Sequence, residues 1–385
     1  MKILIINGSA DLYGANRILL EVMLMLSPKR IVLVVPVNGP LVDLVNNSKD
    51  YEHVTVEIDP AVPVLARNMS SLKGMIGVGK KIRAFRRNLK RIIRQHNIQW
   101  AYINTLSCVL TLRVLKGLNI KRFLHVHEML ENNRLVTRTI NKLALSWSNK
   151  IVTVSDPVRI NLLFAQPSHV EKKVVTVLNG IPDKLQEGTK DYGKNGEVNI
   201  TLFSRIIPEK GIWFFLDAIA LLPQEIAKVC SFRIYGGAAP GKEHFLEKLK
   251  EDISQHKYGK QIAFTTFISD IGVALNGSDI IVVPSLLRDS FPTTVLEGLS
   301  AGKPVIATNT GGAVQSVDDN ITGFLINPSD TNRFAEKMNI LIADEALRVQ
   351  MGKAARSAFL KRFTLNSFRE NLLKEINAFE TVVRK

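Results

Sequence analysis

Short apolar runs alternate with amphipathic stretches along the first half of the chain. The apolar runs are continuous rather than alternating, which is typical of parallel strands whose two faces are both covered by helices. Helical periodicity fills the gaps, for example at 15–26, 80–95 and 156–164. The pattern therefore predicts a helix-covered parallel sheet with strands at 2–7, 31–37, 53–58, 100–104, 122–127, 150–155 and 174–179.

A polar, glycine-containing stretch without periodicity interrupts this pattern at 183–197 and is typical of a linker. Strand-like runs then resume, and a helical pattern covers roughly 344–383. The second set of predicted strands is 199–204, 231–236, 262–267, 279–285, 304–309 and 322–327.

A chain of 385 residues is too long for one ordinary core, so two domains are expected. Each should be a Rossmann-like doubly wound sheet of the α/β class, and ligands should bind in the cleft between them. The expected division is 1–182 for the N-terminal domain, 183–197 for the linker, 198–362 for the C-terminal domain, and 363–385 for a C-terminal helix that packs back on the N-terminal domain.

The formal net charge of +16 implies an anionic partner, which composition alone leaves open among nucleic acid, phosphate-bearing small molecules and an anionic membrane surface. Cys108 and Cys230 lie far apart and form no metal-binding spacing. No apolar run of about 18 residues is present to span a membrane. A reduced, cytoplasmic protein fits these features best.

Charged residues in the second half cluster at predicted strand ends. Arg205 and Lys210 follow the strand at 199–204, where a helix N-terminus would add its dipole to their charges and favour a diphosphate. Asp289 and Glu297, with seven residues between them, flank a helix whose first turn should contain Pro292. Carboxylates accept hydrogen bonds from vicinal hydroxyls, so two acids around a phosphate-binding helix N-terminus suit a nucleotide-sugar.

Six motifs in this order resemble those of the family 4 glycosyltransferases: YGANR, HVHE, TVS, VLNG, SRIIPEKG and DSFPTTVLE. The resemblance extends from Ile3 to the C-terminal helices. It implies the GT-B architecture of two facing Rossmann-like domains. It also implies retaining transfer of a sugar from a nucleotide-diphosphate sugar to a glycan or glycolipid acceptor held by the N-terminal domain.

Transferred residue by residue, the resemblance assigns roles on both sides of the expected cleft. Gly14 would approach the diphosphate or the acceptor, and His127 would face the reaction centre. The predicted site residues are His127 and Asp289 for catalysis; Arg205, Lys210, Gly14, Thr293 and Thr294 for the donor diphosphate; Glu297 for the ribose; and Asp289 with Phe291 for the transferred sugar.

Several positions depart from the family pattern. Asp289 replaces the commoner glutamate, Pro292 a frequent glycine, and Gln315 an acid often found after the Gly-Gly turn. Tyr13 and Asn16 stand where glycine and glutamate are usual. These differences bear on which substrate is used more than on the class of reaction.

The strand end at 122–127 brings two histidines and an acid together. His125 fits a structural role, whereas His127 ends the strand and fits a functional one. Glu128 is either a functional acid or a cap for the helix that follows. No Asp-x-Asp triplet or metal-type cluster is present, so we expect no metal or other cofactor, with fixed cations and helix N–H groups stabilising the leaving group.

Basic residues concentrate at 73–97, on the helical face opposite an apolar stripe of Ile82, Phe85 and Leu89. One interpretation is a solvated helix face; the other is docking on anionic lipid at the inner face of the cell membrane, which would make the protein peripheral and cytoplasmic. No nucleic-acid motif accompanies the patch. The predicted membrane patch is Arg83, Arg86, Arg87, Lys90, Arg91 and Arg94.

Three alternatives stay open from the sequence. A nucleotide-sugar 2-epimerase shares the expected architecture. A dinucleotide-dependent oxidoreductase is disfavoured because no G-x-G-x-x-G follows the first strand. A non-catalytic nucleotide-binding module would use the same strand-end loops without turnover.

Overall fold

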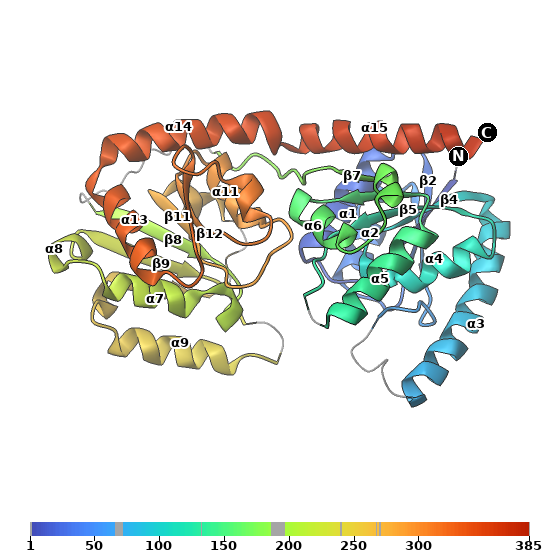
Figure 1. The fold of residues 1–385 in the computed structure, drawn as a ribbon, viewed down its shortest axis with the longest axis horizontal. Coiled ribbons are helices and arrows are strands. Elements are labelled where there is room, and N and C mark those ends of the chain that lie inside the picture. The colour runs from blue at the N-terminus through green and yellow to red at the C-terminus, as the bar shows by residue number, and fades with distance from the viewer. Residues whose placement is uncertain are drawn as a thin grey trace. The chain divides into compact units, whose positions relative to one another are not determined.

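The computed structural model describes residues 2–65, 72–131, 133–185, 197–238, 241–266, 268 and 271–384. It divides into two compact units, of which unit 1 comprises Met1–Asn179 and Phe368–Lys385 and unit 2 comprises Gly180–Ser367 (Figure 1). Most of the predicted linker, at 186–196, lies outside the described residues.

Unit 1 is built on a seven-stranded parallel sheet with the strand order β3-β2-β1-β4-β5-β6-β7. The order reverses between β1 and β4, and ligands of open α/β sheets bind at the carboxyl ends of the strands at such a point. The strands are β1 (Lys2–Ile6), β2 (Arg30–Val35), β3 (Val54–Ile58), β4 (Ile98–Ile103), β5 (Lys121–Val126), β6 (Lys150–Thr153) and β7 (Val174–Thr176).

Helices cover both faces of this sheet. Alternate residues of a strand face opposite sides, and Ile3 and Ile5 of β1 join a core with apolar side chains of α1, α2 and α15. Helix α4 contacts both α3 and α5, and α3 and α4 also contact strands of the sheet. The helices are α1 (Gly14–Met25), α2 (Pro40–Asn47), α3 (Leu72–His96), α4 (Val109–Lys116), α5 (Arg134–Trp147) and α6 (Asp156–Leu163), with 3-10 turns η1 (Lys49–Tyr51), η3 (Leu106–Cys108) and η4 (Ser168–Lys173).

The C-terminal helix α15 (Leu365–Arg384) contributes to the core of unit 1. The ring of Phe379 meets Trp100 edge-on at 5.4 Å between centroids, a geometry worth about 0.5–1.5 kcal/mol beyond burial. Glu380, only 5% exposed, accepts hydrogen bonds from the Trp100 Nε1–H at 3.3 Å and from the Lys29 ammonium at 3.0 Å. The buried carboxylate is therefore paired, and it specifies where α15 packs.

Unit 2 has a six-stranded parallel sheet with the order β10-β9-β8-β11-β12-β13, which reverses between β8 and β11. Its strands are β8 (Val198–Phe203), β9 (Cys230–Tyr235), β10 (Ile262–Thr265), β11 (Ile280–Val283), β12 (Val305–Thr308) and β13 (Gly323–Ile326). Its helices are α7 (Ile212–Ala220), α8 (Gln224–Ala227), α9 (His244–Gln255), α10 (Gly272–Asn276), α11 (Thr293–Ser300), α12 (Ala313–Ser316), α13 (Thr331–Ala343) and α14 (Glu345–Arg362), with 3-10 turns η5 (Pro208–Lys210) and η6 (Gly259–Gln261).

All thirteen predicted strands overlap an observed strand. The helical stretch predicted at 344–383 consists of two helices, because α14 ends at Arg362 and α15 begins at Leu365. Thr364 causes the new start, since its Oγ1 accepts a hydrogen bond from the Ser367 N–H at 3.1 Å and caps α15. Among the described residues, no helix carries an apolar stretch long enough to cross a bilayer.

Candidate active site

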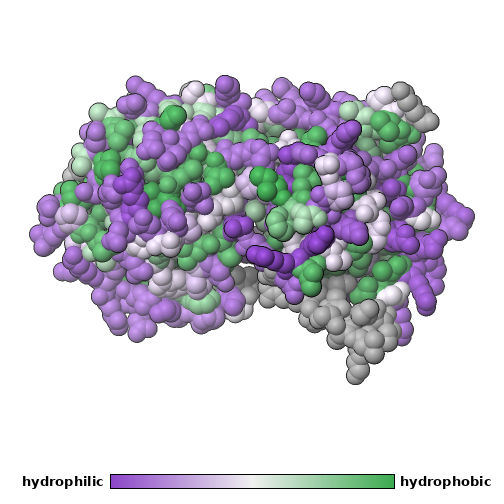
Figure 2. Space-filling view, viewed as in Figure 1, coloured by the Kyte–Doolittle hydropathy of each residue, from purple (hydrophilic) through white to green (hydrophobic). Residues whose placement is uncertain are grey.

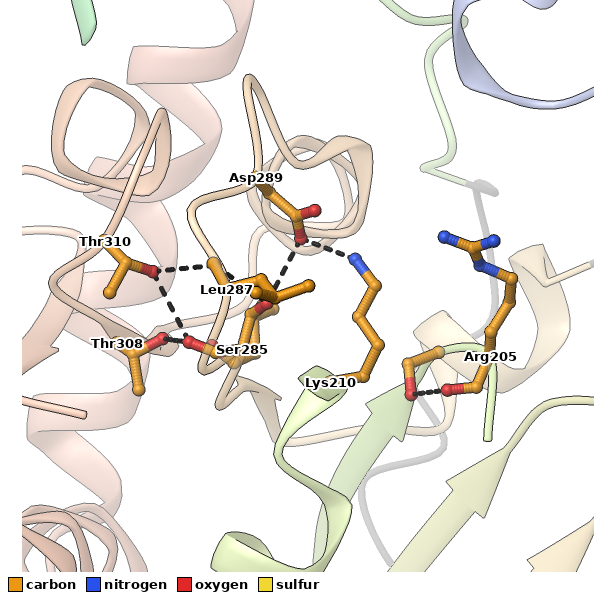
Figure 3. Close-up of polar contacts among 9 residues, drawn as sticks. Arg205, Lys210, Ser285, Leu287, Asp289, Thr308 and Thr310 are labelled. Atoms are coloured by element: carbon orange, nitrogen blue, oxygen red, sulfur yellow. Dashed lines mark hydrogen bonds and ion pairs between the residues drawn. The ribbon is translucent and has the colours of Figure 1, made fainter. Parts of the chain in front are cut away.

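The predicted donor residues of unit 2 lie in loops at the carboxyl ends of β8 and β11, the point where strand order reverses. Arg205 is exposed in the loop that follows β8, and Lys210 ends the 3-10 turn η5 in the same loop. Asp289 lies in the loop between β11 and α11 (Figure 3). The sequence-predicted grouping of these loops is thus reproduced by the topology of the sheet.

Lys210 and Asp289 form an ion pair with 2.6 Å between Nζ and Oδ2 (Figure 3). Their side chains are 18% and 30% exposed, so the pair is partly shielded from solvent. Ser285 Oγ donates to the same carboxylate oxygen at 3.3 Å. The family resemblance assigns the two charged residues to different parts of a donor, and the structure shows that they also position each other.

Backbone contacts lock the η5 loop against the end of β11. The carbonyl oxygen of Glu209 accepts hydrogen bonds from the N–H groups of Leu286 at 2.9 Å and Leu287 at 3.3 Å. Gly211, with φ of +73°, leads into α7, and a Cβ there would lie 1.8 Å from the Pro284 carbonyl oxygen. Only glycine fits both the left-handed conformation and the close approach.

The β12–α12 loop is fastened to the Asp289 loop in the same way. Gly311 has φ of +53°, and a Cβ there would lie 2.0 Å from the Asp289 carbonyl oxygen. That oxygen accepts a hydrogen bond from the Gly312 N–H at 2.7 Å. Thr310 Oγ1 donates to the Leu287 carbonyl at 3.2 Å (Figure 3). The backbone around Asp289 is therefore held from both neighbouring strands.

The helix α11 that follows Asp289 begins one residue later than predicted. Pro292 is its N-cap rather than a residue of its first turn, because its ψ of 113° is extended. Thr293 and Thr294 form the helix start and are half-buried, and Glu297 lies one turn further along. The roles of these three residues toward a donor stay predictions.

Phe291 is the one predicted sugar contact that unit 2 largely buries. It is 7% exposed, and its ring lies 5.9 Å from that of Phe363, between centroids. This packing gives Phe291 a structural role, and its contact with a sugar stays a prediction.

A polar cavity of about 290 Å³ lies in unit 1 at the corresponding reversal of strand order. Residues that follow β1, β4 and β5 line it, among them Asn7, Asp11, Asn16 and Glu128. Sequence reasoning missed the first two of these residues and treated Asn16 only as a departure from the family pattern. The signal available was the polar stretch NGSAD directly after the first strand.

Three buried carboxamides connect β4 to the β1–α1 loop. Asn104 donates from Nδ2 to Asn7 Oδ1 at 3.0 Å, and Asn7 donates to Asn16 Oδ1 at 2.8 Å. Asn16 in turn donates to Asp11 Oδ1 at 3.0 Å and to Ser9 Oγ at 2.9 Å. Asn7 and Asn16 each accept one hydrogen bond and donate others, which a carboxamide can do and a carboxylate cannot.

His127 and His125 are buried side by side at the end of β5, with ring centroids 4.1 Å apart. Burial lowers the pKa of His127 to about 3, and burial, followed by the repulsion that a protonated His127 would exert, lowers the pKa of His125 well below its usual value. His125 Nδ1 bonds with the Tyr102 hydroxyl, and both Nε2 atoms lack a partner among the described residues. His127 is thus a neutral imidazole; its catalytic role stays a prediction.

Glu128 does not cap the helix after it, so that interpretation is wrong. Asn133 provides the cap of α5, whereas the Glu128 carboxylate bonds with Thr105 Oγ1 and with the N–H groups of Leu106 and His127, both at 3.1 Å. Burial raises the pKa of Glu128, although these hydrogen bonds act in the opposite direction.

Gly14 is the first residue of α1 and is exposed. A Cβ placed there would have no described atom within 4 Å. Its space is therefore open, as a residue that approaches a ligand requires, and its contact with the diphosphate or the acceptor stays a prediction.

The predicted basic patch lies along α3 with every member exposed. Phe85, Leu89 and Ile92 are buried on the opposite side of the helix, which confirms the apolar stripe. Among the described residues, the one ion pair made by the patch joins Arg91 to Glu57 at 3.4 Å. The six exposed cations are Arg83, Arg86, Arg87, Lys90, Arg91 and Arg94.

Two parallel-sheet units, each with its candidate site where the strand order reverses, are characteristic of the GT-B glycosyltransferases. The crystal structure of Anabaena Alr3699/HepE in complex with UDP superposes with a TM-score of 0.80 at 18% identity, covering 98% of this chain and 100% of that one. The complex of the same protein with UDP-glucose gives a TM-score of 0.77, also at 18% identity, with coverage of 98% and 100%. The predicted GT-B fold is confirmed.

Residues 186–358 match the family described as glycosyl transferases group 1. The chain is 26% identical over 334 residues to the uncharacterized glycosyltransferase MJ1178 of Methanocaldococcus jannaschii, covering 84% of this chain and 88% of that protein. It is 22% identical over 349 residues to the capsular polysaccharide biosynthesis glycosyltransferase CapM of Staphylococcus aureus, with coverage of 87% and 88%. The chain is a glycosyltransferase, and the part of it that matches the group 1 family lies in the C-terminal half.

Proposed function

We propose that the protein transfers a sugar, with retention of configuration, from a nucleotide-diphosphate sugar to a glycan or lipid-linked acceptor in surface polysaccharide or glycolipid synthesis. The bond between the sugar C1 and the diphosphate oxygen breaks, and C1 forms a bond to an acceptor hydroxyl oxygen. The nucleoside diphosphate leaves, and one of its phosphate oxygens accepts the hydroxyl proton. Retention is supported by the family resemblance.

The observation that carries this proposal is the Lys210–Asp289 pair, held at the reversal of strand order in unit 2. An ammonium beside a carboxylate presents a cation for a diphosphate and an acceptor for sugar hydroxyls within 2.6 Å of each other. The crystal structures of HepE with UDP and with UDP-glucose support a donor of this class. Arg205, at the end of the neighbouring strand β8, would add a second cation for the diphosphate.

Measurements of nucleotide binding and of donor turnover should distinguish the role of Glu297 from that of Asp289. Full-length protein is screened against UDP-, GDP- and ADP-sugars by saturation-transfer NMR, and turnover is followed as release of nucleoside diphosphate with and without acceptor. Glu297→Gln should weaken binding of the free nucleoside diphosphate, because its proposed contact is the ribose. Asp289→Asn should spare that binding and impair use of the intact donor.

Asp217→Asn, in α7, is the matched loss of one carboxylate from unit 2 and should leave both quantities unchanged. Equal weakening of free nucleoside diphosphate binding by Glu297→Gln and Asp289→Asn would refute the division of roles. Nucleoside diphosphate release that is independent of acceptor, with interconversion of the donor sugar, would instead support the epimerase.

We propose further that no metal is required, because Lys210, Arg205 and the start of α11 provide the positive field at the leaving group. EDTA should leave most of the activity. Complete loss that Mg²⁺ or Mn²⁺ restores would contradict this part of the proposal.

The acceptor, in this proposal, is presented at the anionic inner face of the cell membrane, where the protein binds peripherally. The exposed cations of α3 support this, since each basic residue near an anionic surface adds about 1 kcal/mol. The CapM relative and a 22% identical relative from Campylobacter jejuni, described as an N-acetylgalactosaminyltransferase acting on N,N'-diacetylbacillosaminyl-diphospho-undecaprenol, fit such an acceptor.

Exposed apolar side chains on α5 and at the end of α6 also support binding of unit 1 to a membrane. Leu135 and Val136 are 73% and 52% exposed, and Ile160 and Phe164 are 65% and 64% exposed. Helix α4 contacts both α3 and α5, so the basic residues of α3 and the exposed apolar residues of α5 lie on helices that share a neighbour. Figure 2 shows hydrophobic side chains among hydrophilic ones where α5 and α6 lie in Figure 1.

Liposome sedimentation tests the membrane surface. Wild type should bind anionic vesicles, and rising salt should weaken the binding. Replacement of Arg86, Arg87, Lys90 and Arg91 by glutamine should abolish most of it, whereas glutamine at four other exposed lysines (Lys228, Lys248, Lys250 and Lys260) should not. Equal binding to neutral and anionic vesicles would leave α3 as a solvated face.

A further inference from the structure

We propose that the cavity of unit 1 binds one hydroxyl-rich sugar unit of the acceptor that carries no negative charge, and that Asp11 selects for this absence of charge. The inference rests on the proposed function, because it names the chemical class of the group that receives the transferred sugar. It concerns binding, so it can be tested apart from turnover.

The volume of the cavity limits the size of its ligand. At about 290 Å³ it lies at the lower end of ligand pockets, which suits a single monosaccharide unit and is too small to enclose an intact nucleotide-sugar. It opens at the carboxyl ends of β1, β4 and β5, where sheets of this kind bind ligands.

The lining is polar and acidic although the chain as a whole is strongly basic. Asp11 and Glu128 place two carboxylates in the wall, and the described lining residues include no lysine or arginine. Arg17, the nearest cation in sequence, donates its Nε–H to the Leu12 carbonyl at 3.1 Å and does not line the cavity. A phosphate or uronate in this cavity would meet like charges and no described cation, which disfavours its binding.

Asp11 has an oxygen available for a ligand. Its Oδ1 accepts hydrogen bonds from the Tyr13 N–H at 2.9 Å and from Asn16 Nδ2 at 3.0 Å. Its Oδ2 has no partner among the described residues. A carboxylate fixed through one oxygen and open at the other is suited to accept from a sugar hydroxyl.

Asn16 makes this arrangement possible. It is 3% exposed, accepts from Asn7 and donates to both Asp11 and Ser9. A carboxylate at position 16 could not donate, and it would face Asp11 with a like charge. Asn16 is therefore a positioning residue that holds the Asp11 carboxylate at the wall of the cavity.

The test measures charge selectivity with small probes on the full-length protein. Methyl glucoside, methyl galactoside and methyl mannoside are each compared with the corresponding methyl uronate by ligand-observed NMR, with UDP present. For at least one pair, wild type should bind the neutral probe at least about fivefold more tightly. Asp11→Asn should bring that ratio close to one by weakening the neutral probe and admitting the uronate.

Two control variants locate the effect. Asp50→Asn removes an exposed carboxylate elsewhere in unit 1, and Asp289→Asn removes the one proposed for the donor sugar; neither should change the ratio. Asp11→Glu keeps the charge and should retain selectivity against uronates. This result would show that Asp11→Asn loses selectivity because it loses the charge and not because it misfolds.

Equal or tighter binding of the uronates by wild type would overturn the inference, as would absence of saturation transfer from every neutral probe. An unchanged ratio in Asp11→Asn would overturn the role of that residue. If the ratio behaves as expected but no nucleotide-sugar supports transfer, the proposed function fails while the cavity remains a sugar site. Sugar transfer from a nucleotide-sugar without charge selectivity in probe binding would refute this inference and leave the proposed function standing.

Discussion

The two candidate sites occupy equivalent places in their sheets, yet they are held together by different means. In unit 2, the loops that follow β8, β11 and β12 approach one another through backbone atoms, with Gly211 and Gly311 at the contacts. In unit 1, the loops that follow β1 and β4 are joined by carboxamide side chains around an open cavity.

This difference has a consequence for specificity. A loop fixed by backbone contacts keeps its shape whatever the neighbouring side chains are, which suits a site for a donor class shared by many enzymes. A loop fixed by Asn7, Asn16 and Asn104 depends on those particular side chains, so a single substitution can reshape it. We therefore expect substitutions of these glycines to lower the stability of unit 2. Substitutions of the polar residues in unit 1 should instead change which ligands it binds.

The largest expected effect is on the stability of unit 2. Gly211→Ala or Gly311→Ala should cost at least about 3 kcal/mol or prevent folding, because each combines left-handed strain with a Cβ that would lie only 1.8 or 2.0 Å from a carbonyl oxygen. Denaturant unfolding monitored by the fluorescence of Trp213, in α7, reports on this unit.

Gly241→Ala provides the matched control. Its φ is also positive, at +74°, but no described atom lies within 4 Å of the added Cβ. It should lose only the strain term, about 1–2 kcal/mol. If all three variants lose the same stability, the close backbone contacts do not hold these loops.

The next largest effect concerns activity rather than stability. Lys210→Ala should reduce kcat/KM at least about tenfold, since a charge-assisted contact is worth about 1.5–3 kcal/mol. The ion pair with Asp289 is partly exposed, so the loss of folding stability should stay below about 1 kcal/mol. Steady-state kinetics and denaturant unfolding measure the two quantities separately.

Lys228→Ala, an exposed residue of the same unit, makes the same change in charge and should leave kcat/KM unchanged. Unaltered kinetics of Lys210→Ala would show that the pair is structural and that the diphosphate binds elsewhere.

The strands could be predicted from the sequence because buried parallel strands are continuous apolar runs. The loops of the donor site could be predicted as well, since parallel strands place their carboxyl ends at one edge. The Lys210–Asp289 pair could not, because its partners are 79 residues apart and meet only when β11 packs directly against β8.

The carboxamide chain of unit 1 could not be predicted from the sequence either. The polar stretch NGSAD marks the loop after β1, but asparagine is common in turns and caps, so no pattern connects Asn7 and Asn16 with Asn104. Their function depends on β1 and β4 being neighbours and on which amide atom faces which, and neither follows from periodicity.

A smaller effect should distinguish the two units by pH. His127 has a folded-state pKa of about 3, below its ordinary value of about 6.5, so the unfolded chain binds the proton more readily. This contribution to the free energy of unfolding is complete above about pH 6.5 and is lost as the pH falls toward 3. The loss reaches about 1.4 kcal/mol by pH 5.5. His125 acts in the same direction. Glu128, with its raised pKa, acts in the opposite direction.

Unfolding of a Trp213→Phe variant, which leaves Trp100 and Trp147 of unit 1 as reporters, should therefore show a lower midpoint at pH 5.5 than at pH 8. His127→Gln should have a smaller pH dependence than its parent. A parent midpoint that is independent of pH over this range would show that the two imidazoles are not held neutral by the fold.

The smallest effect on stability, and the sharpest test of the contrast between the units, is expected at Gly14. An added methyl group meets no described atom within 4 Å, and alanine is the better helix former, so Gly14→Ala should change the free energy of unfolding by no more than about 1 kcal/mol. Because the fold tolerates the methyl group, any loss of activity reports a clash with a ligand. We expect kcat/KM for the donor to fall severalfold, and binding of the acceptor probes to change little if Gly14 approaches the diphosphate. Preserved kinetics with both substrates would remove Gly14 from the site, whereas a large loss of stability would mean that a glycine in unit 1 serves the fold as Gly211 does in unit 2.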